Sequence, residues 1–594
     1  MKRKMLCLSL LLIIVVLVVA ACGGNETESG DGGTVVPPQE TVVDQGANQD
    51  TTEAGADQPG EDAHAHLPIY LRPMAERITL GFGVGYGTPE GNVPPGTIPS
   101  TSAIPAILSE FLNIEMDFLW EVPTAQADDR FQLALVAGDM PDIMRLDAID
   151  FAELSRFGML RDLGPAFERY AHPEIRAMFD YFGNVPLEMS TVDGQLMAIP
   201  YIWDTHQQIS LLFYRRDWLD ALGLAVPTTM DEMHAVAVAF VENDMSGQGN
   251  TTGLGLFSEL VHWAPDARGL FHGYGAYPTK WIERGGELVF GTIQPETRDA
   301  LNRMRRMYAD GAINPEFATM NTDQLVADIV GDRVGLAYGE WWLPAWPFNQ
   351  TLDTNPNADW GVTRIVTPSG APGITAISRN NINHRFGVSV NAPEGTEEAL
   401  IRMLNLWWEI SYVRPSRVDL NPYNTAEAGF VWNWMPAYLM LGHEQYLNYT
   451  IVHEALRTGD TSTFFNNMQW NLYTNTRWRN EGATFYDVVD NWNTPTASGA
   501  WGLYMSRVDH DGGWGTTMQV REDGHFIFDE FYGDPTPTEI SRGSILHDMW
   551  EEFALRYIMG ALPYDSWYTF VNDWRNLGGD DWTREVNEQF RALQ

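Results

Sequence analysis

The stretch YGEWWLPAWPF, residues 338–348, gathers three indole side chains beside a carboxylate. Trp341, Trp342 and Trp346 lie within six positions, and Glu340 comes directly before them. These residue types suit a sugar ring, whose apolar C–H faces stack on flat aromatics while carboxylate, amide or Arg groups take its hydroxyls. A loop folded into the core is the alternative, because aromatic clusters are usually packing. The rest of the chain has to decide between the two interpretations.

The N-terminus carries an export signal. Its sequence MKRKMLCLSLLLIIVVLVVAACGG has a basic start, an apolar run of about fifteen residues and then small residues, a pattern typical of a secretory signal and too short to span a membrane. Residues 19–22, Val-Ala-Ala-Cys, look like a bacterial lipobox. We therefore expect a signal peptide over residues 1–22 and a lipid anchor on Cys22, which would tether the protein to the extracytoplasmic face of a bacterial cell membrane. A plain signal with a chance cysteine is the alternative.

The two cysteines limit the chemistry. Cys7 leaves with the predicted signal, and only Cys22 then remains. The mature chain can form no internal disulfide, although its compartment is oxidising. Thiol catalysis and cysteine-based zinc sites are excluded by the same count.

A polar, acidic segment follows the signal. From Gly23 to about His66 it contains no Lys or Arg and almost no large apolar group. Such a segment cannot bury enough surface to offset the entropy of ordering it. We assign residues 23–74 to a disordered acidic linker, and expect His64 and His66 to be solvated.

Charge excludes one class of partner. The formal net charge is −42. Nucleic acid is not expected as a partner, because the phosphate backbone demands a basic footprint. An anionic membrane surface is disfavoured for the same reason.

Strand and helix signals alternate through the rest of the chain. Residues 77–84 (RITLGFGV) read as a buried strand, and residues 209–224 run from strand into helix. Thr229 and Glu232 have the spacing of a capping box at the start of the next helix. This alternation predicts an α/β architecture with parallel sheets.

Five stretches resemble family 1 extracellular solute-binding proteins, in the family's order. The first resembles the family's turn, strand and Tyr-x-Arg-Asp-Trp-Leu helix, and the resemblance covers the chain from about residue 75 to its end. The stretches are GQLMAIPYIWD with LLFYRRDWLDALGLAVPTTMDEMHAVAVAF, FQLALVAGDMPDIM, YADGAINPEFATM, DRVGLAYGEWWLPAWP and MGALPYDSWYTFVNDWRNLGG.

The resemblance implies a two-lobe, type II periplasmic-binding-protein-like fold with a ligand cleft between lobes joined by crossover hinges. It also implies a receptor for an ABC importer, with the transporter's permease subunits as partners, no cofactor and a monomeric state. Members of this length mostly handle sugars or oligosaccharides. The lobes are predicted to comprise residues 75–203 with 372–415 and residues 204–371 with 416–594.

The same resemblance selects binding residues. A Trp after the Gly is a frequent sugar-stacking residue in the family, and Trp341 best matches that position. If the strand continues, Trp342 points to the opposite side, so one of the two is expected in the core. Further candidates lie at strand ends, where two-lobed α/β folds place ligands. They are Tyr86, Asp147, Asp150, Trp203, Asp204 and Trp263, besides Trp342, Trp346 and Glu340, with Trp120, Trp432 and Trp434 as weaker candidates.

Other motifs are absent or degenerate. GFGVGYG, residues 81–87, lacks the third glycine of a dinucleotide loop. Residues 244–253 sit where family members often carry a calcium-loop-like run, but only Asp244 is charged within the loop, so we predict a turn and no metal.

We therefore expect a carbohydrate receptor without catalytic activity. A peptide receptor is the alternative within the same class. A secreted glycoside hydrolase is the enzymatic alternative, because many carboxylate pairs are available and the aromatics would suit sugars. A surface adhesin is a third possibility, and the predicted crossovers speak against it.

Overall fold

The computed structural model describes residues 67–86, 97–413, 435–463, 469, 472–473, 497–533 and 535–593, all within the compact unit Asp62–Gln594. The predicted signal, Cys22, the linker up to residue 66, Trp432 and Trp434 lie outside these ranges. No helix of the described part is long and apolar enough to cross a membrane.

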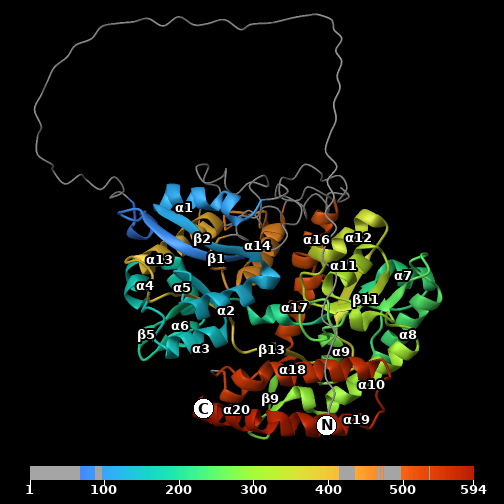
Figure 1. The fold of residues 1–594 in the computed structure, drawn as a ribbon. Coiled ribbons are helices and arrows are strands. Elements are labelled where there is room, and N and C mark those ends of the chain that lie inside the picture. Colours follow the sequence, from blue (N-terminus) through green and yellow to red (C-terminus); the bar gives the residue numbers. More distant parts are fainter. Residues whose placement is uncertain are drawn as a thin grey trace, which may run out of the picture. The chain divides into compact units, whose positions relative to one another are not determined.

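The first sheet region is built from five strands. β1 (Ile78–Tyr86) pairs in parallel with β2 (Ile114–Pro123). Beside them β3 (Ile143–Leu146), β14 (Ile382–Val388) and β6 (Ala198–Ile202) pair in the order β3-β14-β6. The backbone of Asp142 donates to the carbonyl of Gly81 at 2.9 Å, which joins β3 to β1. Helices of this region, several of them labelled in Figure 1, are α1 (Ile104–Leu112), α2 (Ala127–Ala137), α3 (Ala148–Arg156), α4 (Gly164–Tyr170), α5 (Pro173–Tyr181), α6 (Val185–Glu188) and α13 (Thr396–Trp408).

The second sheet has the order β12-β7-β11-β8. Its strands are β12 (Trp360–Arg364), β7 (Leu211–Arg215), β11 (Val334–Gly339) and β8 (Thr252–Leu254). Its helices are α7 (Arg216–Leu222), α8 (Met230–Glu242), α9 (Arg268–Gly273), α10 (Pro295–Ala309), α11 (Thr322–Val330), α12 (Asn349–Thr354) and α17 (Gly513–Glu522).

The expectation of parallel sheets is wrong for one strand in each region. β14 is antiparallel to β3 and β6, and β7 is antiparallel to β11 and β12. Each is the first strand after the chain passes from one hydrophobic core to the other, so it enters its sheet from the opposite direction. The remaining strands of each sheet run parallel to one another.

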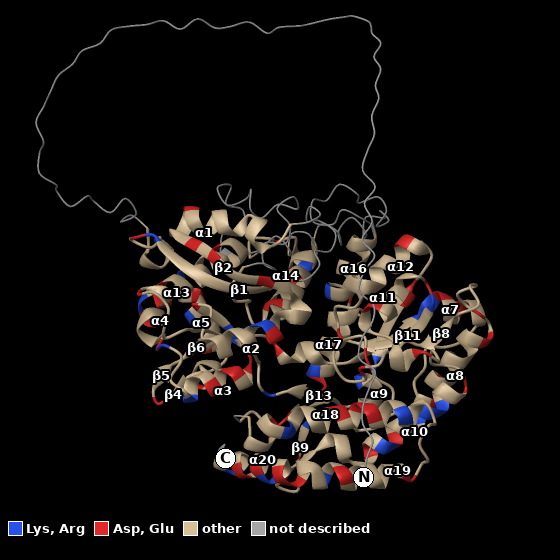
Figure 2. Cartoon of the chain, viewed as in Figure 1, with Lys and Arg blue, Asp and Glu red and all other residues tan. Residues whose placement is uncertain are grey.

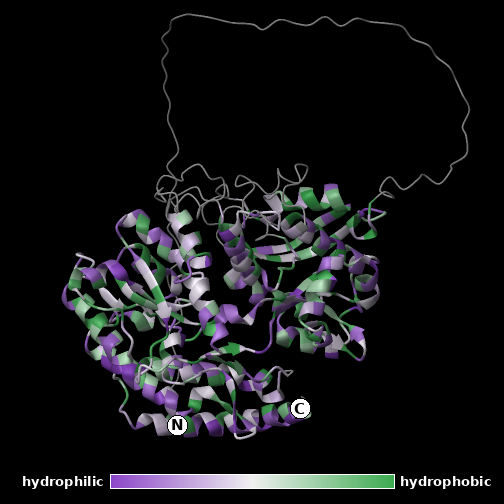
Figure 3. Ribbon diagram, turned by 180° about the vertical axis from the view of Figure 1, so that it is seen from behind, coloured by the Kyte–Doolittle hydropathy of each residue, from purple (hydrophilic) through white to green (hydrophobic). Residues whose placement is uncertain are grey.

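Each sheet packs on one large core, and a smaller buried cluster lies on the other face of each sheet. The first large core contains Leu80, Ile199 and Phe386, and the second contains Leu212 and Leu336. In Figure 3 the helices show alternating hydrophilic and hydrophobic stretches, as expected for helices with one buried face.

Two chain segments that connect these cores run side by side. The backbone of Trp203 donates to the carbonyl of Asn381 at 3.0 Å, and the backbone of Ser378 donates to the Gln208 side chain at 2.7 Å. The lobe boundaries proposed from the sequence stay a prediction, and the third crossing, expected near residues 412–424, falls largely outside the described residues.

The C-terminal part of the chain returns to the second core. β13 (Thr375–Ser378) pairs in parallel with β15 (Phe526–Asp529), and the hairpin β9 (Trp281–Arg284) and β10 (Glu287–Phe290) packs with the last helices. These helices and their neighbours are α14 (Glu444–Thr458), α16 (Ala497–Arg507), α18 (Pro537–Ile558), α19 (Ser566–Trp574) and α20 (Asp580–Leu593). A short hairpin, β4 (Thr191–Val192) and β5 (Gln195–Leu196), lies in the first region.

The predicted capping box is confirmed. Thr229 and Glu232 form the capping box of α8: the Glu232 backbone donates to the Thr229 hydroxyl at 3.2 Å, and the Glu232 carboxylate accepts from the Thr229 backbone. The folded part begins earlier than expected, because Tyr70 and Met74, assigned to the linker, contact the first core. The Tyr70 carbonyl accepts from Asn405 at 3.0 Å, and Met74 is buried.

Residues 81–86 of the glycine-rich run belong to strand β1 and not to a nucleotide loop. Gly81, Gly83 and Gly85 share one face of the strand. A Cβ atom on Gly83 would collide with the indole of Trp120, and one on Gly85 with Ala127. The glycines therefore let bulky neighbours lie directly on the strand, which explains the run without a ligand.

We predict that Gly83→Val destabilises the protein by about 1–3 kcal/mol, because the added atoms overpack the contact with Trp120. Urea unfolding followed by circular dichroism measures the change. Gly543→Ala is the control, since a Cβ there makes only an ordinary contact at 3.6 Å and alanine favours the helix. Equal stability of Gly83→Val and the wild-type protein would contradict this packing.

Candidate ligand-binding site

The aromatic stretch begins where β11 ends. β11 stops at Gly339, and the backbone of Leu343 donates to the Glu340 carbonyl at 3.2 Å, closing a turn. A short helical segment, Pro344–Phe348, follows and is interrupted at Trp346, whose backbone is extended. The chain thus turns sharply at the end of β11, and this turn brings Trp342 and Trp346 close together.

Three indoles form a cluster that we call the three-indole platform: Trp263, Trp342 and Trp346. The ring centroids of Trp263 and Trp342 lie 5.1 Å apart at 28°. Trp346 lies 5.5 Å from Trp263 and 6.2 Å from Trp342. Trp263 is 44% exposed, and the other two are half-buried. The platform therefore presents aromatic surface to solvent.

A backbone bridge brings Trp263 to the other two indoles. Asp266 bridges Tyr338 of β11, with the Asp266 backbone donating to the Tyr338 carbonyl at 3.2 Å. A Cβ on Gly269 would collide with the Tyr338 ring, so the glycine lets helix α9 approach the strand. The segment before α9 consequently runs beside the end of β11.

A buried carboxylate holds the platform in place. Glu340 accepts from the Trp342 indole nitrogen at 2.8 Å and from Arg268 at 3.1 Å. Arg268 also pairs with Asp266 at 2.5 Å. Burial alone would lower the pKa of Arg268, but Asp266 and Glu340 raise it above its usual value. Arg268 therefore stays charged, and Glu340 fixes the orientation of Trp342.

Trp341, the residue that best matched the family's stacking position, lies in the core. It is 4% exposed and meets Trp514 edge to face, with ring centroids 5.3 Å apart. The Arg507 guanidinium lies 4.9 Å from its ring. Trp341 offers no open face in this structure, and Trp342 is the more accessible, half-buried member of the pair.

The candidates of the first sheet lie at the carboxyl ends of its strands. Asp147 is exposed and caps α3, accepting from the Asp150 backbone at 2.7 Å. Asp150 is half-buried and accepts from Gln132 at 2.9 Å. Burial raises the pKa of Asp150, and the charge of Asp147 adds to that shift. Tyr86, the last residue of β1, is half-buried beside the first core.

Trp203 and Asp204 lie on the first connecting segment. Trp203 is half-buried. Asp204 is buried, hydrogen-bonds to His206 at 2.6 Å and faces Arg521 of α17 at 3.8 Å. Burial would raise the pKa of Asp204, but His206 and Arg521 hold it below its usual value. Asp204 thus stays ionised and links the connecting segment to α17.

The sequence reasoning missed the cationic residues of these edges. Arg268 supports Glu340, and Arg521 faces Asp204. Arg145 is exposed near the carboxyl end of β3, and the described residues provide it with no ion pair. Its position two residues before Asp147, at a predicted strand end, could have drawn attention to it. Figure 2 shows such basic residues interspersed with acidic ones.

The loop over residues 244–253 is closed by its own hydrogen bonds. The Asp244 carboxylate accepts from the Gly249 backbone at 2.9 Å, from the Thr251 hydroxyl at 2.9 Å and from the Ser246 hydroxyl at 3.2 Å. These bonds, that from Thr251 first, lower the pKa of Asp244. Within the described residues, no group of three or more His, Cys, Asp or Glu is placed to hold a metal ion.

Comparison with protein families identifies the family of this chain. The family model of the bacterial extracellular solute-binding proteins matches residues 97–401. The chain belongs to this family. The matched region contains both connecting segments, Trp203, Asp204 and the three-indole platform.

Curated relatives match part of the chain. YtcQ, a polygalacturonan/rhamnogalacturonan-binding protein of Bacillus subtilis (strain 168), is 32% identical over 232 residues, 38% of this chain and 44% of that protein. FusA, the fructooligosaccharide ABC transporter substrate-binding protein of Streptococcus pneumoniae serotype 4, is 20% identical over 300 residues, 48% of this chain and 53% of that protein. The chain thus matches about half the length of these relatives.

Solved structures confirm the fold. The alginate-binding protein AlgQ2 without calcium superposes with a TM-score of 0.57 at 16% identity, covering 87% of this chain and 98% of that one. FusA in complex with kestose gives a TM-score of 0.58 at 14% identity, covering 87% and 99%. The chain has the two-lobe α/β fold of the type II solute-binding proteins.

We predict that Trp341→Ala lowers the free energy of unfolding of the ligand-free protein by about 3–5 kcal/mol, the cost of removing a buried large aromatic side chain. Trp346→Ala, the matched variant in the same stretch, should cost only about 0.5–1.5 kcal/mol, the value of its ring contacts. Chemical denaturation of both variants provides the comparison. An unchanged stability of Trp341→Ala would show that this indole is not core.

Calcium should not stabilise this protein, because Asp244 is occupied by donors of its own loop. Adding millimolar Ca²⁺, or a chelator, is expected to leave the Tm unchanged in differential scanning fluorimetry. Asp244→Ala should lower the Tm in both conditions equally, since the loop donors lose their acceptor. A rise in Tm with Ca²⁺ that disappears in Asp244→Ala would reveal a metal site.

Proposed function

We propose that this chain is the substrate-binding lipoprotein of an ABC importer and that it binds an oligosaccharide at the three-indole platform. The observation that carries the proposal is the cluster of Trp263, Trp342 and Trp346, in which Glu340, itself paired with Arg268, holds the Trp342 indole. Stacked indoles provide flat apolar faces for the C–H faces of sugar rings. Polar groups at the rim provide partners for hydroxyls.

The relatives support a carbohydrate over a peptide. YtcQ is named for polygalacturonan and rhamnogalacturonan, and FusA for fructooligosaccharides. A peptide receptor would be expected to pair with the backbone amides of its ligand, whereas the platform is made of ring faces. Several indoles in one cluster also favour a ligand of more than one sugar unit.

A binding role without catalysis fits the carboxylates near the platform. A glycosidase needs one carboxylic acid and one carboxylate free to act on the glycosidic bond. Glu340 accepts hydrogen bonds on both oxygens, and both Asp266 and Glu340 pair with Arg268. These two carboxylates are therefore committed to holding the platform.

The remaining parts of the proposal come from the N-terminus and the family. The lipobox-like run ending at Cys22 supports a lipid anchor, which places the protein at the extracytoplasmic face of the cell membrane. Permease subunits of an importer are the macromolecular partners of such a receptor. Ligand held between two lobes requires one chain only, so we propose a monomer.

A thermal-shift screen over oligosaccharides and peptides tests the proposal. An oligosaccharide at one hundred times its Kd should stabilise the wild-type protein by about 2.7 kcal/mol through mass action. Trp342→Ala and Trp346→Ala should lose most of that shift, because each removes a stacking face. Isothermal titration of the hit then gives the affinities.

Phe157→Ala provides the control, because Phe157 is an exposed aromatic at the end of α3, away from the platform stretch. It should retain the full ligand-induced shift. Stabilisation by peptides alone, release of sugar products by the purified protein, or an unchanged affinity in both Trp variants would each contradict the proposal.

A further inference from the structure

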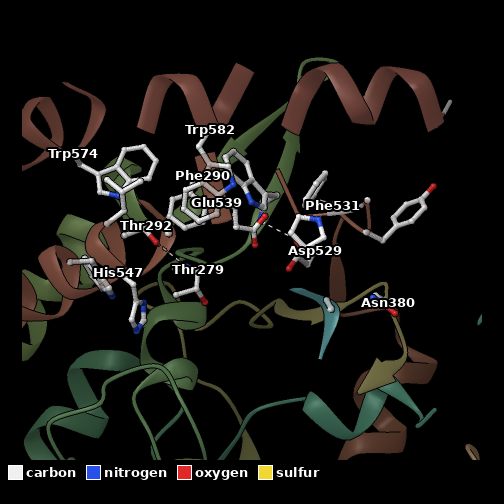
Figure 4. Close-up of a pocket in the computed structure, with 18 residues that line it drawn as sticks. Thr279, Phe290, Thr292, Asn380, Asp529, Phe531, Glu539, His547, Trp574 and Trp582 are labelled. Carbon is white, nitrogen blue, oxygen red and sulfur yellow. Dashed lines mark hydrogen bonds between the residues drawn. The ribbon is translucent and has the colours of Figure 1, made fainter. Parts of the chain in front are cut away.

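A second aromatic site lies outside the three-indole platform. A pocket of about 280 Å³ is lined by residues of β9, β10, β15, α18 and α20. Figure 4 shows Phe290, Trp574 and Trp582 grouped on one side, with Asn380 toward the opposite end. None of the platform residues is among the described residues that line this pocket.

The floor of the pocket consists of buried rings. Phe290 stacks on Trp574 with centroids 5.3 Å apart at 11°, and lies 5.1 Å from Trp582 and 4.8 Å from Trp281. All four rings belong to the second core and are held by it. The floor is therefore held by the core, and only small parts of Phe290 and Trp582, at 8% and 9% exposure, are accessible to an occupant.

Two carboxylates stand beside these rings. Asp529 accepts from the Trp281 backbone at 3.0 Å and lies 3.5 Å from the Lys280 ammonium. Glu539 belongs to the capping box of α18. Burial raises the pKa of both carboxyl groups. When an occupant excludes water, any carboxylate oxygen that receives no hydrogen bond from the occupant costs free energy.

These features define the chemistry of the occupant. A purely apolar ligand would leave the remaining acceptor sites of the two carboxylates without donors. A free ammonium would have to share Asp529 with Lys280. A hydroxyl-rich ring suits both the aromatic floor and the carboxylates. Its C–H face covers the aromatic rings, and its hydroxyls donate to the carboxylates. The volume lies just below the range of pockets for drug-sized molecules, which indicates one ring.

The pocket also borders the segments that connect the two cores. Asn380 precedes Asn381, whose carbonyl accepts from Trp203. Ala148 directly follows Asp147 at the edge of the first sheet, and both Ala148 and Asn380 line the pocket. The pocket therefore lies beside both the edge of the first sheet and the connecting segments.

We propose that this pocket binds a terminal ring of the oligosaccharide and thereby selects for chain length. The inference rests on the proposed function and adds a second point of contact to it. Affinity should rise with chain length until one end of the ligand reaches the pocket.

Gly543 offers a way to block the pocket without disturbing its floor. It lies on α18, lines the pocket, and a Cβ there meets only the Glu539 side chain at an ordinary 3.6 Å. Gly543→Phe should fill the space, and Gly543→Leu provides a smaller blocking side chain. Ser544→Phe is the matched control, because Ser544 is the exposed neighbour on the same helix and does not line the pocket.

Titration calorimetry with an oligosaccharide series of increasing length tests the proposal. Gly543→Phe should bind the shortest ligands like wild-type protein and lose about tenfold affinity for the long ones, whereas Ser544→Phe should match wild type at every length. Melting curves verify that each variant is folded, and Gly543→Leu replaces the larger variant if it is not.

If the folded blocking variant and the wild-type protein bind oligosaccharides of every length with equal affinity, the pocket does not bind a terminal ring. The proposed function would then still stand. A wild-type protein that binds no oligosaccharide of any length would contradict the proposed function itself.

Discussion

The platform depends on one buried carboxylate. Glu340 is held between the Arg268 guanidinium and the Trp342 indole, and Arg268 is neutralised in turn by Asp266. Removing one partner of a buried ion pair is costly, because the other charge is left without compensation. This arrangement fixes the indole before any ligand arrives, so the ligand need not provide the ordering. Asp266 also bridges β11, which couples the platform to the second sheet.

Two connecting segments join the first sheet to the second. Hydrogen bonds between Trp203 and Asn381, and between Ser378 and Gln208, hold the two segments side by side. Few groups make these contacts, so bending there requires little repacking. The buried Asp204 and its partner His206 lie on the same segment, and Arg521 joins Asp204 to α17. Ligand would favour one arrangement of the lobes only through contacts to both sides.

Local features of this fold were predictable, and long-range ones were not. The capping box at Thr229 and the strand at residues 77–84 follow from neighbouring residues. The burial of Trp341 depends on Trp514, and the position of Trp263 depends on a bridge to Tyr338. Neither contact leaves a periodic signal in the sequence. The aromatic pocket was missed for the same reason, since its rings come from segments far apart in the chain.

Hydrogen–deuterium exchange with and without a bound oligosaccharide tests the central claim most directly. The account predicts simultaneous protection of residues 260–268 and 339–348 around the platform and of residues 145–150 and 203–208 at the edge of the first sheet. Two-sided protection is what a ligand held between the lobes produces. Protection confined to one sheet, or unchanged exchange at the platform in the presence of saturating sugar, would contradict the account.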